Sequence, residues 1–170
     1  MKDHPVWNVY DSLRTISLNV KYYTRRIIFF ERFNFWLELI IAIATSTAIA
    51  KFTIWGTATG SLIWSIIGGL AVLLSVIKPL LRFSDRIKKI ENVLTKYRLI
   101  KHEYQILKID ISEKKCYCKE HEKIFHDLLN KETLLIEVVP ENYISNRLRT
   151  KCQKEVIKEY PIDNFYIPKE

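Results

Sequence analysis

The sequence predicts an all-α membrane protein: a two-helix transmembrane hairpin with an antiparallel cytoplasmic helical stalk and additional C-terminal helices. Three observations predict this fold class. Two long apolar runs follow one another at about residues 35–55 and 58–77. Amphipathic patterns with helical spacing flank these runs on both sides. Almost all of the net charge of +8 lies outside them. The chain therefore divides into an apolar hairpin and a charged helical body.

The first expected element is an amphipathic cytoplasmic helix over residues 6–33. Its apolar side chains step by three and four along the chain, which places them on one helix face. They are Leu13, Ile16, Val20, Tyr23, Ile27 and Phe30. A face this narrow needs one partner helix rather than a surrounding core.

The transmembrane hairpin is expected over residues 34–78. A bilayer span needs about 20 apolar residues. The second run reaches that length, and the first reaches it only with Glu38 and Lys51 near the interfaces, so it is expected to insert as half of a pair. The second run carries no charge, and the first has only Glu38 and Lys51 near its ends. In the alternative, the two runs form the core of a soluble protein. The charged remainder of the chain offers no apolar segment of comparable strength to cover them, so the sequence favours lipid.

Basic residues predict the topology, because Lys and Arg concentrate on the cytoplasmic side of membrane helices. They flank the hairpin at both ends, whereas its turn has only Lys51, so both termini are expected in the cytoplasm. The candidate membrane-anchoring residues are Arg25, Arg26, Arg32, Lys78, Arg82, Arg86, Lys88 and Lys89. Such a surface can also bind the phosphates of a nucleotide messenger. The hairpin beside it favours anionic lipid over nucleic acid as the partner.

Small and polar residues inside the two runs are the candidates for helix packing or for lining a pore. They are Glu38, Ala42, Thr45, Ser46, Ser61, Ser65, Gly68 and Gly69. Small residues four apart can pack the two spans on each other, or they can hold neighbouring copies of the chain. Glu38 can form a carboxylate ring at the mouth of an oligomer, or it can pair with Arg32 or another flanking base. Two helices cannot enclose an aqueous path, so conduction requires a homo-oligomer.

A long cytoplasmic helix is expected over residues 79–111, with Pro79 in its first turn. Its apolar seam consists of Leu80, Phe83, Ile87, Ile90, Leu94 and Tyr97, and is extended by Tyr104, Leu107 and Ile111. Because the hairpin returns the chain to the same membrane surface, this seam can meet that of residues 6–33 in an antiparallel stalk. Either helix can instead lie flat on anionic lipid.

Residues 112–170 are expected to form further helices and a tail. A third helical pattern uses Ile124, Leu128, Leu135 and Val139 and ends at Pro140, although the segment TLLIEVV can also form a short strand. A fourth helix is expected from about Tyr143 to Tyr160, stopped by Pro161. The tail PIDNFYIPKE is either ordered or loosely attached.

The segment CYCKEHEKIFH contains potential metal ligands, namely Cys116, Cys118, His121 and His126. Only one residue separates the two cysteines and no second pair follows, so the spacing does not favour a structural zinc site. Solvated histidines on a charged helix are expected instead. The odd number of cysteines indicates a reducing compartment. The sequence shows neither a glycine-rich phosphate loop nor a catalytic grouping, so neither enzymatic activity nor a cofactor is expected.

The order of these parts resembles the SLATT family, the two-transmembrane effector domains of bacterial antiviral systems. The likeness lies in the N-terminal segment VKYYTRRIIFFERFNFW, the two spans joined by a short turn, and the long helix KPLLRFSDRIKKIENVLTKYRLIKHEYQIL. More loosely it includes TKCQKEVIKEY near the end of the chain. The resemblance implies an effector of the bacterial inner membrane. A nucleotide second messenger or an upstream sensor protein would trigger such an effector, which would then permeabilise the membrane and kill the cell.

Two other functions fit the same organisation. A phage holin of the two-span type also keeps both ends inside, but it needs no sensing domain. A non-conducting membrane adaptor would recruit a cytosolic partner through its C-terminal helices. Deletion of residues 112–170 and a leakage assay in liposomes separate these alternatives.

Overall fold

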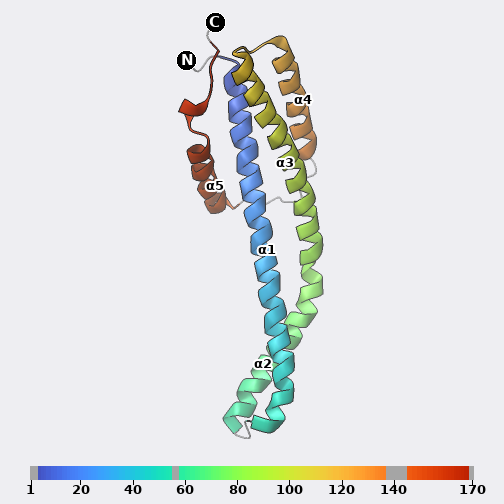
Figure 1. Cartoon of the computed structure of the whole chain (residues 1–170). Coiled ribbons are helices and arrows are strands. Elements are labelled where there is room, and N and C mark those ends of the chain that lie inside the picture. Colours follow the sequence, from blue (N-terminus) through green and yellow to red (C-terminus); the bar gives the residue numbers. More distant parts are fainter. Residues whose placement is uncertain (1–3, 55–57, 137–144, 169–170) are drawn as a thin grey trace. The chain divides into compact units, whose positions relative to one another are not determined.

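The computed structural model describes the backbone of residues 4–54, 58–136 and 145–168. Side chains at 45–54, 58–65, 80–81 and 136 lie outside this description. The described chain forms five α-helices, a short 3-10 turn and no strand, which confirms the predicted all-α class (Figure 1). The helices are α1 (Val6–Ile54), α2 (Ala58–Leu81), α3 (Phe83–Lys114), α4 (Lys119–Ile136) and α5 (Asn146–Glu159), and the turn is η1 (Ile162–Asn164).

The first amphipathic helix and the first apolar run belong to one continuous helix, α1. No Gly or Pro interrupts it, so the change from an amphipathic to an apolar pattern occurs without a break in the backbone hydrogen bonds. The helices pack into two compact units. The first, which we call the body, contains residues 1–26 and 89–170, and the second, the hairpin unit, contains residues 27–88.

The break between α2 and α3 lies at Arg82 rather than at Pro79. We expected Pro79 in the first turn of a new helix, but it lies inside α2, near its C-terminal end. Arg82 adopts a left-handed conformation with φ of 44°, and its carbonyl accepts the first hydrogen bond of α3, from the amide of Arg86 at 3.1 Å. Left-handed backbone is costly for a residue with a Cβ and interrupts the right-handed helix at this position.

In the body, the predicted seams of α1 and α3 are buried and lie side by side (Figure 1). Tyr23 stacks on Tyr97 with ring centroids 5.5 Å apart. The first turns of α1 lie beside the last turns of α3 in Figure 1. Larger residue numbers on α3 thus meet smaller ones on α1, so the two helices run antiparallel here.

Helix α4 packs on α3 through a face slightly different from the predicted one. Leu128 and Leu135 are buried as expected, but Ile124 is 44% exposed, and Phe125 and His121 are buried in its place. Val139 and Pro140 lie outside the described residues. The part of TLLIEVV that the structure describes is helical, since α4 extends to Ile136.

The tail after α5 is ordered in the described residues and packs on α1. Phe165 stacks on Tyr10 with ring centroids 4.2 Å apart, and the guanidinium of Arg14 lies 4.9 Å from the centre of the same ring. The hydroxyl of Tyr10 donates a hydrogen bond of 2.5 Å to the carbonyl of Tyr166. Of the two alternatives for the tail, the structure therefore supports the ordered one.

Candidate functional site

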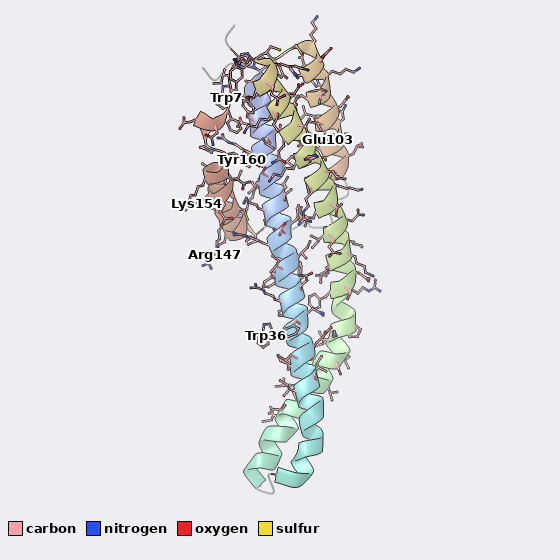
Figure 2. All side chains as sticks on the ribbon, viewed as in Figure 1. Trp7, Trp36, Glu103, Arg147, Lys154 and Tyr160 are labelled. Carbon is pink, nitrogen blue, oxygen red and sulfur yellow. The ribbon has the colours of Figure 1, made fainter. Side chains whose placement is uncertain are left out.

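The hairpin unit exposes large apolar side chains on both of its long helices. Among the described side chains of this unit, thirteen large apolar ones are at least 40% exposed, and we call them the outer apolar surface. On α1 they are Ile28, Phe29, Phe33, Phe35, Trp36, Ile40 and Ile43, and on α2 they are Ile66, Leu70, Val72, Leu73, Val76 and Ile77. Trp36 is one of them: it is 59% exposed, and Figure 2 shows its side chain pointing away from α1.

The side chains that the hairpin unit buries include small ones. Ala44 on α1 and Ala71 on α2 are only 5% and 6% exposed. Ile27 and Phe83, each 8% exposed, are also buried, but they lie outside the segments around Ala44 and Ala71. A helix of a soluble protein has large apolar residues inside and polar ones outside along its whole length, unlike these segments. The thirteen outward side chains expose on the order of 1,000 Å² of apolar area. Soluble monomers rarely expose contiguous apolar patches above a few hundred Å².

An ion pair links α1 and α2 within the hairpin unit. The ammonium of Lys78 lies 2.7 Å from Oε1 of Glu38, and the amide of Asn34 donates to the same oxygen at 3.0 Å. Of the two roles expected for Glu38, the structure places it in a pair with a flanking base. Arg32, the other base considered as its partner, is exposed.

The predicted packing residues fall into two groups. Thr45, Ser46, Ser61 and Ser65 lie outside the described side chains. Ala42 and Gly69 are exposed and Gly68 is half-buried. Among the described residues, a Cβ added at Gly68 or Gly69 would meet no atom of another helix within 4 Å. These glycines are therefore not required for the packing of the two helices within one chain.

The predicted anchoring bases also differ in their surroundings. Arg82, Arg86, Lys88 and Lys89 are exposed, like Arg32. Lys78 is paired with Glu38, and Arg26 is half-buried. Arg25 lies in the body, where its Nη2 is 2.6 Å and 2.7 Å from the two carboxylate oxygens of Glu155.

Helix α5 is held on α1 by a series of charged contacts, which we call the α1–α5 ladder. Arg25 pairs with Glu155, and Lys21 pairs with Glu159 at 2.7 Å. Arg14 then donates two hydrogen bonds, of 2.6 Å and 3.1 Å, to the carbonyl of Tyr160 at the end of α5. The residue numbers run in opposite directions, so the two helices are antiparallel.

This ladder was not predicted from the sequence, although the spacing of its charged residues signals it. Lys21 and Arg25 are four apart, and Glu155 and Glu159 are also four apart, so each pair occupies one helix face. Burial alone would raise the pKa of Glu159, but the hydrogen bond and charge of Lys21, together with the charge of Lys101, hold it below its usual value.

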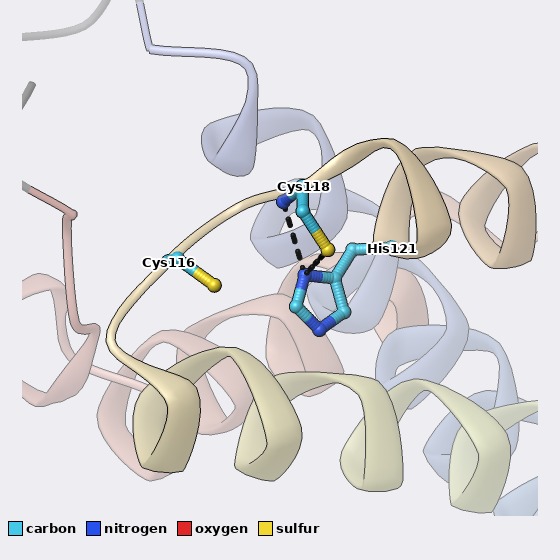
Figure 3. A group of neighbouring side chains, drawn as sticks. All are labelled: Cys116, Cys118 and His121. Atoms are coloured by element: carbon cyan, nitrogen blue, oxygen red, sulfur yellow. Dashed lines mark hydrogen bonds between the residues drawn. The ribbon is translucent and has the colours of Figure 1, made fainter.

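The cysteine and histidine residues near the start of α4 form a cluster rather than a set of solvated side chains. We expected His121 to be solvated. It is instead fully buried, because α4 directs its side chain toward α3. Its Nδ1 lies 3.3 Å from Sγ of Cys118 and 3.2 Å from the backbone nitrogen of Cys118 (Figure 3). One ligand atom each from Cys116, Cys118 and His121 lies within 4.8 Å of the others. His126 is exposed and takes no part.

Asp110 on α3 completes the surroundings of His121. Its Oδ2 lies 2.9 Å from Nε2 of the imidazole and 3.0 Å from the ammonium of Lys114. Hydrogen bonds from Lys114 and His121 lower the pKa of Asp110, so this carboxyl is ionised at neutral pH. Asp110 precedes the cluster by several residues, and only the reversal of the chain between α3 and α4 brings it to His121.

No single helix among the described residues is both long and apolar enough to cross a membrane. One bent pair of consecutive segments, Ile66–Pro79 followed by Phe83–Lys114, passes the same test of length and composition. No protein-family model, no curated protein and no solved structure matches the chain. The resemblance to the SLATT family therefore rests on the order of the helices and stays a prediction.

Proposed function

We propose that this protein is a membrane effector that oligomerises and permeabilises the bacterial inner membrane when a cytoplasmic signal reaches its body. The hairpin unit would insert into the bilayer with both termini in the cytoplasm. The observation that carries the proposal is the outer apolar surface, where the large side chains point outward. Lipid tails can cover such a surface, whereas water cannot do so without a large cost.

The proposal also accounts for the pair between Lys78 and Glu38. Both residues lie close to the cytoplasmic ends of the two spans, where long charged side chains reach the headgroup region. Pairing reduces the cost of bringing either charge near hydrocarbon. The exposed bases of the same region, Arg32, Arg82 and Arg86 among them, then face the anionic headgroups.

Assembly of several copies is needed, because one hairpin encloses no path for ions. Gly68 and Gly69 are suited to this contact, since no described side chain occupies the space beside them. Glycine lets neighbouring membrane helices approach closely, and their association depends on such packing. In the assembled form, these two positions would meet a helix of the next copy.

The signal would act on the body, and the α1–α5 ladder is suited to transmit it. A trigger can shift the equilibrium only by binding the open or assembled form better than the resting form. We propose that release of α5 from α1 accompanies opening. A nucleotide second messenger or an upstream sensor protein can supply the trigger.

Leakage of a trapped dye from liposomes of bacterial lipid tests the proposal. Gly69→Leu should abolish leakage but not insertion, because the larger side chain keeps neighbouring helices apart. Ser75→Leu is the matched control, since it introduces the same side chain at an exposed position of α2. Leakage should persist in this control. Full leakage from a well-inserted Gly69→Leu variant would remove this helix face from the mechanism.

Two further outcomes distinguish the alternatives. A holin should still permeabilise after deletion of residues 112–170, whereas a gated effector should become silent or permanently active. A membrane adaptor should insert and never release dye, whichever variant is used.

A further inference from the structure

Three potential soft-metal ligands meet at the junction between α3 and α4, and their arrangement goes beyond what the membrane proposal uses. Cys116 and Cys118 lie on the connection between the two helices, and His121 lies in the first turn of α4. Accessibility decreases along this series: Cys116 is exposed, Cys118 half-buried and His121 fully buried. The cluster is therefore buried at His121 and open to solvent at Cys116.

We propose that Cys116, Cys118 and His121 bind a thiophilic divalent cation, Zn²⁺, with one thiolate from each cysteine and Nδ1 of the histidine as ligands. The inference is independent of the proposed membrane function. Thiolate and imidazole are the ligands that Zn²⁺ prefers in proteins. Binding displaces the two thiol protons to solvent, so that the ion and two thiolates form a complex with no net change of oxidation state.

The distances are compatible with this ion. Bond lengths of about 2.3 Å to sulfur and about 2.0 Å to nitrogen in a tetrahedral site place sulfur and nitrogen about 3.5 Å apart. The observed distance between Sγ of Cys118 and Nδ1 of His121 is 3.3 Å. All three ligand atoms already lie within 4.8 Å of one another, so a change in the side-chain rotamer of the exposed Cys116 can complete the set.

The hydrogen bonds of His121 select the tautomer that a metal ligand requires. The backbone amide of Cys118 can only donate, so Nδ1 of a neutral His121 is the acceptor and Nε2 carries the proton. That proton is donated to Oδ2 of Asp110 at 2.9 Å. A carboxylate on the distal nitrogen is the usual support of a metal-binding histidine, because it orients the ring and increases its basicity. The ion would replace the long 3.2 Å contact from the Cys118 amide.

The neighbouring ring of Tyr117 restricts the imidazole further. Its plane is inclined by 22° to that of His121, with centroids 6.1 Å apart. Because Asp110 and Tyr117 both restrict the imidazole of His121, this side chain loses little conformational freedom when it binds a metal ion, which favours affinity. Three protein ligands leave one position of a tetrahedral site for water or an external donor.

The same contacts have a simpler explanation in helix capping. Cys118 directly precedes α4, and the side chain of His121, three residues later, accepts the Cys118 amide as the glutamate of a capping box does. Capping requires neither Cys116 nor a thiol at position 118. Cys118→Ser therefore separates the two explanations, because serine preserves the cap and removes the thiolate.

The test uses the full-length protein, reduced, stripped of metal and held in detergent micelles. Zn²⁺ affinity is measured by competition with a chromophoric chelator, and Co²⁺ is added separately as a spectroscopic probe. We expect one Zn²⁺ per chain and a thiolate-to-cobalt charge-transfer band. Cys118→Ser and His121→Ala should weaken binding by about 100-fold or more, and Asp110→Asn by about 10- to 100-fold. His126→Ala is the matched control and should bind as the wild type does.

Alkylation of the thiols provides a second measurement that does not depend on the variants. Bound Zn²⁺ should protect Cys116 and Cys118 and leave the reactivity of Cys152, which lies on α5, unchanged. The proposal is overturned if Zn²⁺ binds less than one equivalent per chain. It is equally overturned if Cys118→Ser binds Zn²⁺ as tightly as the wild type or if the ion protects neither thiol.

Discussion

The ion pair between Arg25 and Glu155 provides a way to release α5 while leaving the core of the body intact. Glu155→Arg replaces an attraction with a repulsion. Both side chains are partly accessible, at 31% and 37%, so solvent screens their interaction. Pairs of this kind contribute about 0.5–1 kcal/mol, and like charges cost a similar amount, so the variant should weaken α5 docking by about 1–2 kcal/mol.

Hydrogen exchange of backbone amides measures this effect, because it reports the local opening free energy of each helix. A loss of 1–2 kcal/mol should accelerate exchange in α5 by about 5- to 30-fold, since about 1.4 kcal/mol corresponds to a factor of ten. Exchange in α3 should stay unchanged. The double variant Arg25→Glu with Glu155→Arg should restore most of the protection, and Lys154→Glu, at an exposed position of the same helix, should have little effect.

The reasoning is refuted if α5 exchanges at the wild-type rate in Glu155→Arg. It is also refuted if all helices accelerate equally, because the pair would then stabilise the whole body rather than the docking of one helix. If release of α5 accompanies opening, the same variant should leak dye from liposomes without a trigger.

Other predictions concern Phe165, Glu132 and Glu159 in the body. Phe165→Ala removes a ring stacked on Tyr10 and should lower the free energy of unfolding of the body by about 3 kcal/mol, measured by denaturant titration. Burial raises the pKa of Glu132 against a smaller opposing effect of Tyr104, so ionisation of Glu132 destabilises the fold as pH rises through that pKa. Glu132→Gln should therefore stabilise the protein by about 1 kcal/mol at pH 7, with the gain disappearing below about pH 4; an undiminished gain in acid would contradict this explanation. The pKa of Glu159 is lowered, so its contribution to α5 docking is complete above the usual carboxyl pKa and is lost as pH falls through the lowered value. Hydrogen-exchange protection of α5 should therefore fall with pH in the wild type. The same loss should not occur in Glu159→Gln.

Local periodicity was sufficient to predict the seams of α1 and α3. Residues such as Leu13, Ile16, Leu94 and Leu107 are buried as expected, because steps of three and four place side chains on one helix face whatever the tertiary context. The end of α2 was less predictable. Proline is compatible with both the last and the first turn of a helix, and only the left-handed backbone of Arg82 shows where the break lies.

The α1–α5 ladder depends on contacts between segments distant in sequence, and the burial of His121 depends on the reversal of the chain between α3 and α4. The spacing of Cys116 and Cys118 gave no reason to expect that α4 would bury His121 against Asp110. The basic residues before the first apolar run likewise suggested membrane anchoring. Arg25 was counted among them because it precedes that run in the sequence. Its partner, Glu155, lies more than a hundred residues further along the chain, so composition near the spans could not reveal the pair.

The central claim is that lipid, rather than water or protein, covers the outer apolar surface of residues 27–88. Extraction of membranes from expressing cells with alkaline carbonate, followed by sizing of the released material in detergent-free buffer, tests it most directly. The account predicts that the full-length chain stays in the membrane pellet and leaves it only with detergent. Release of the chain as a stable monomer in detergent-free buffer would contradict the claim.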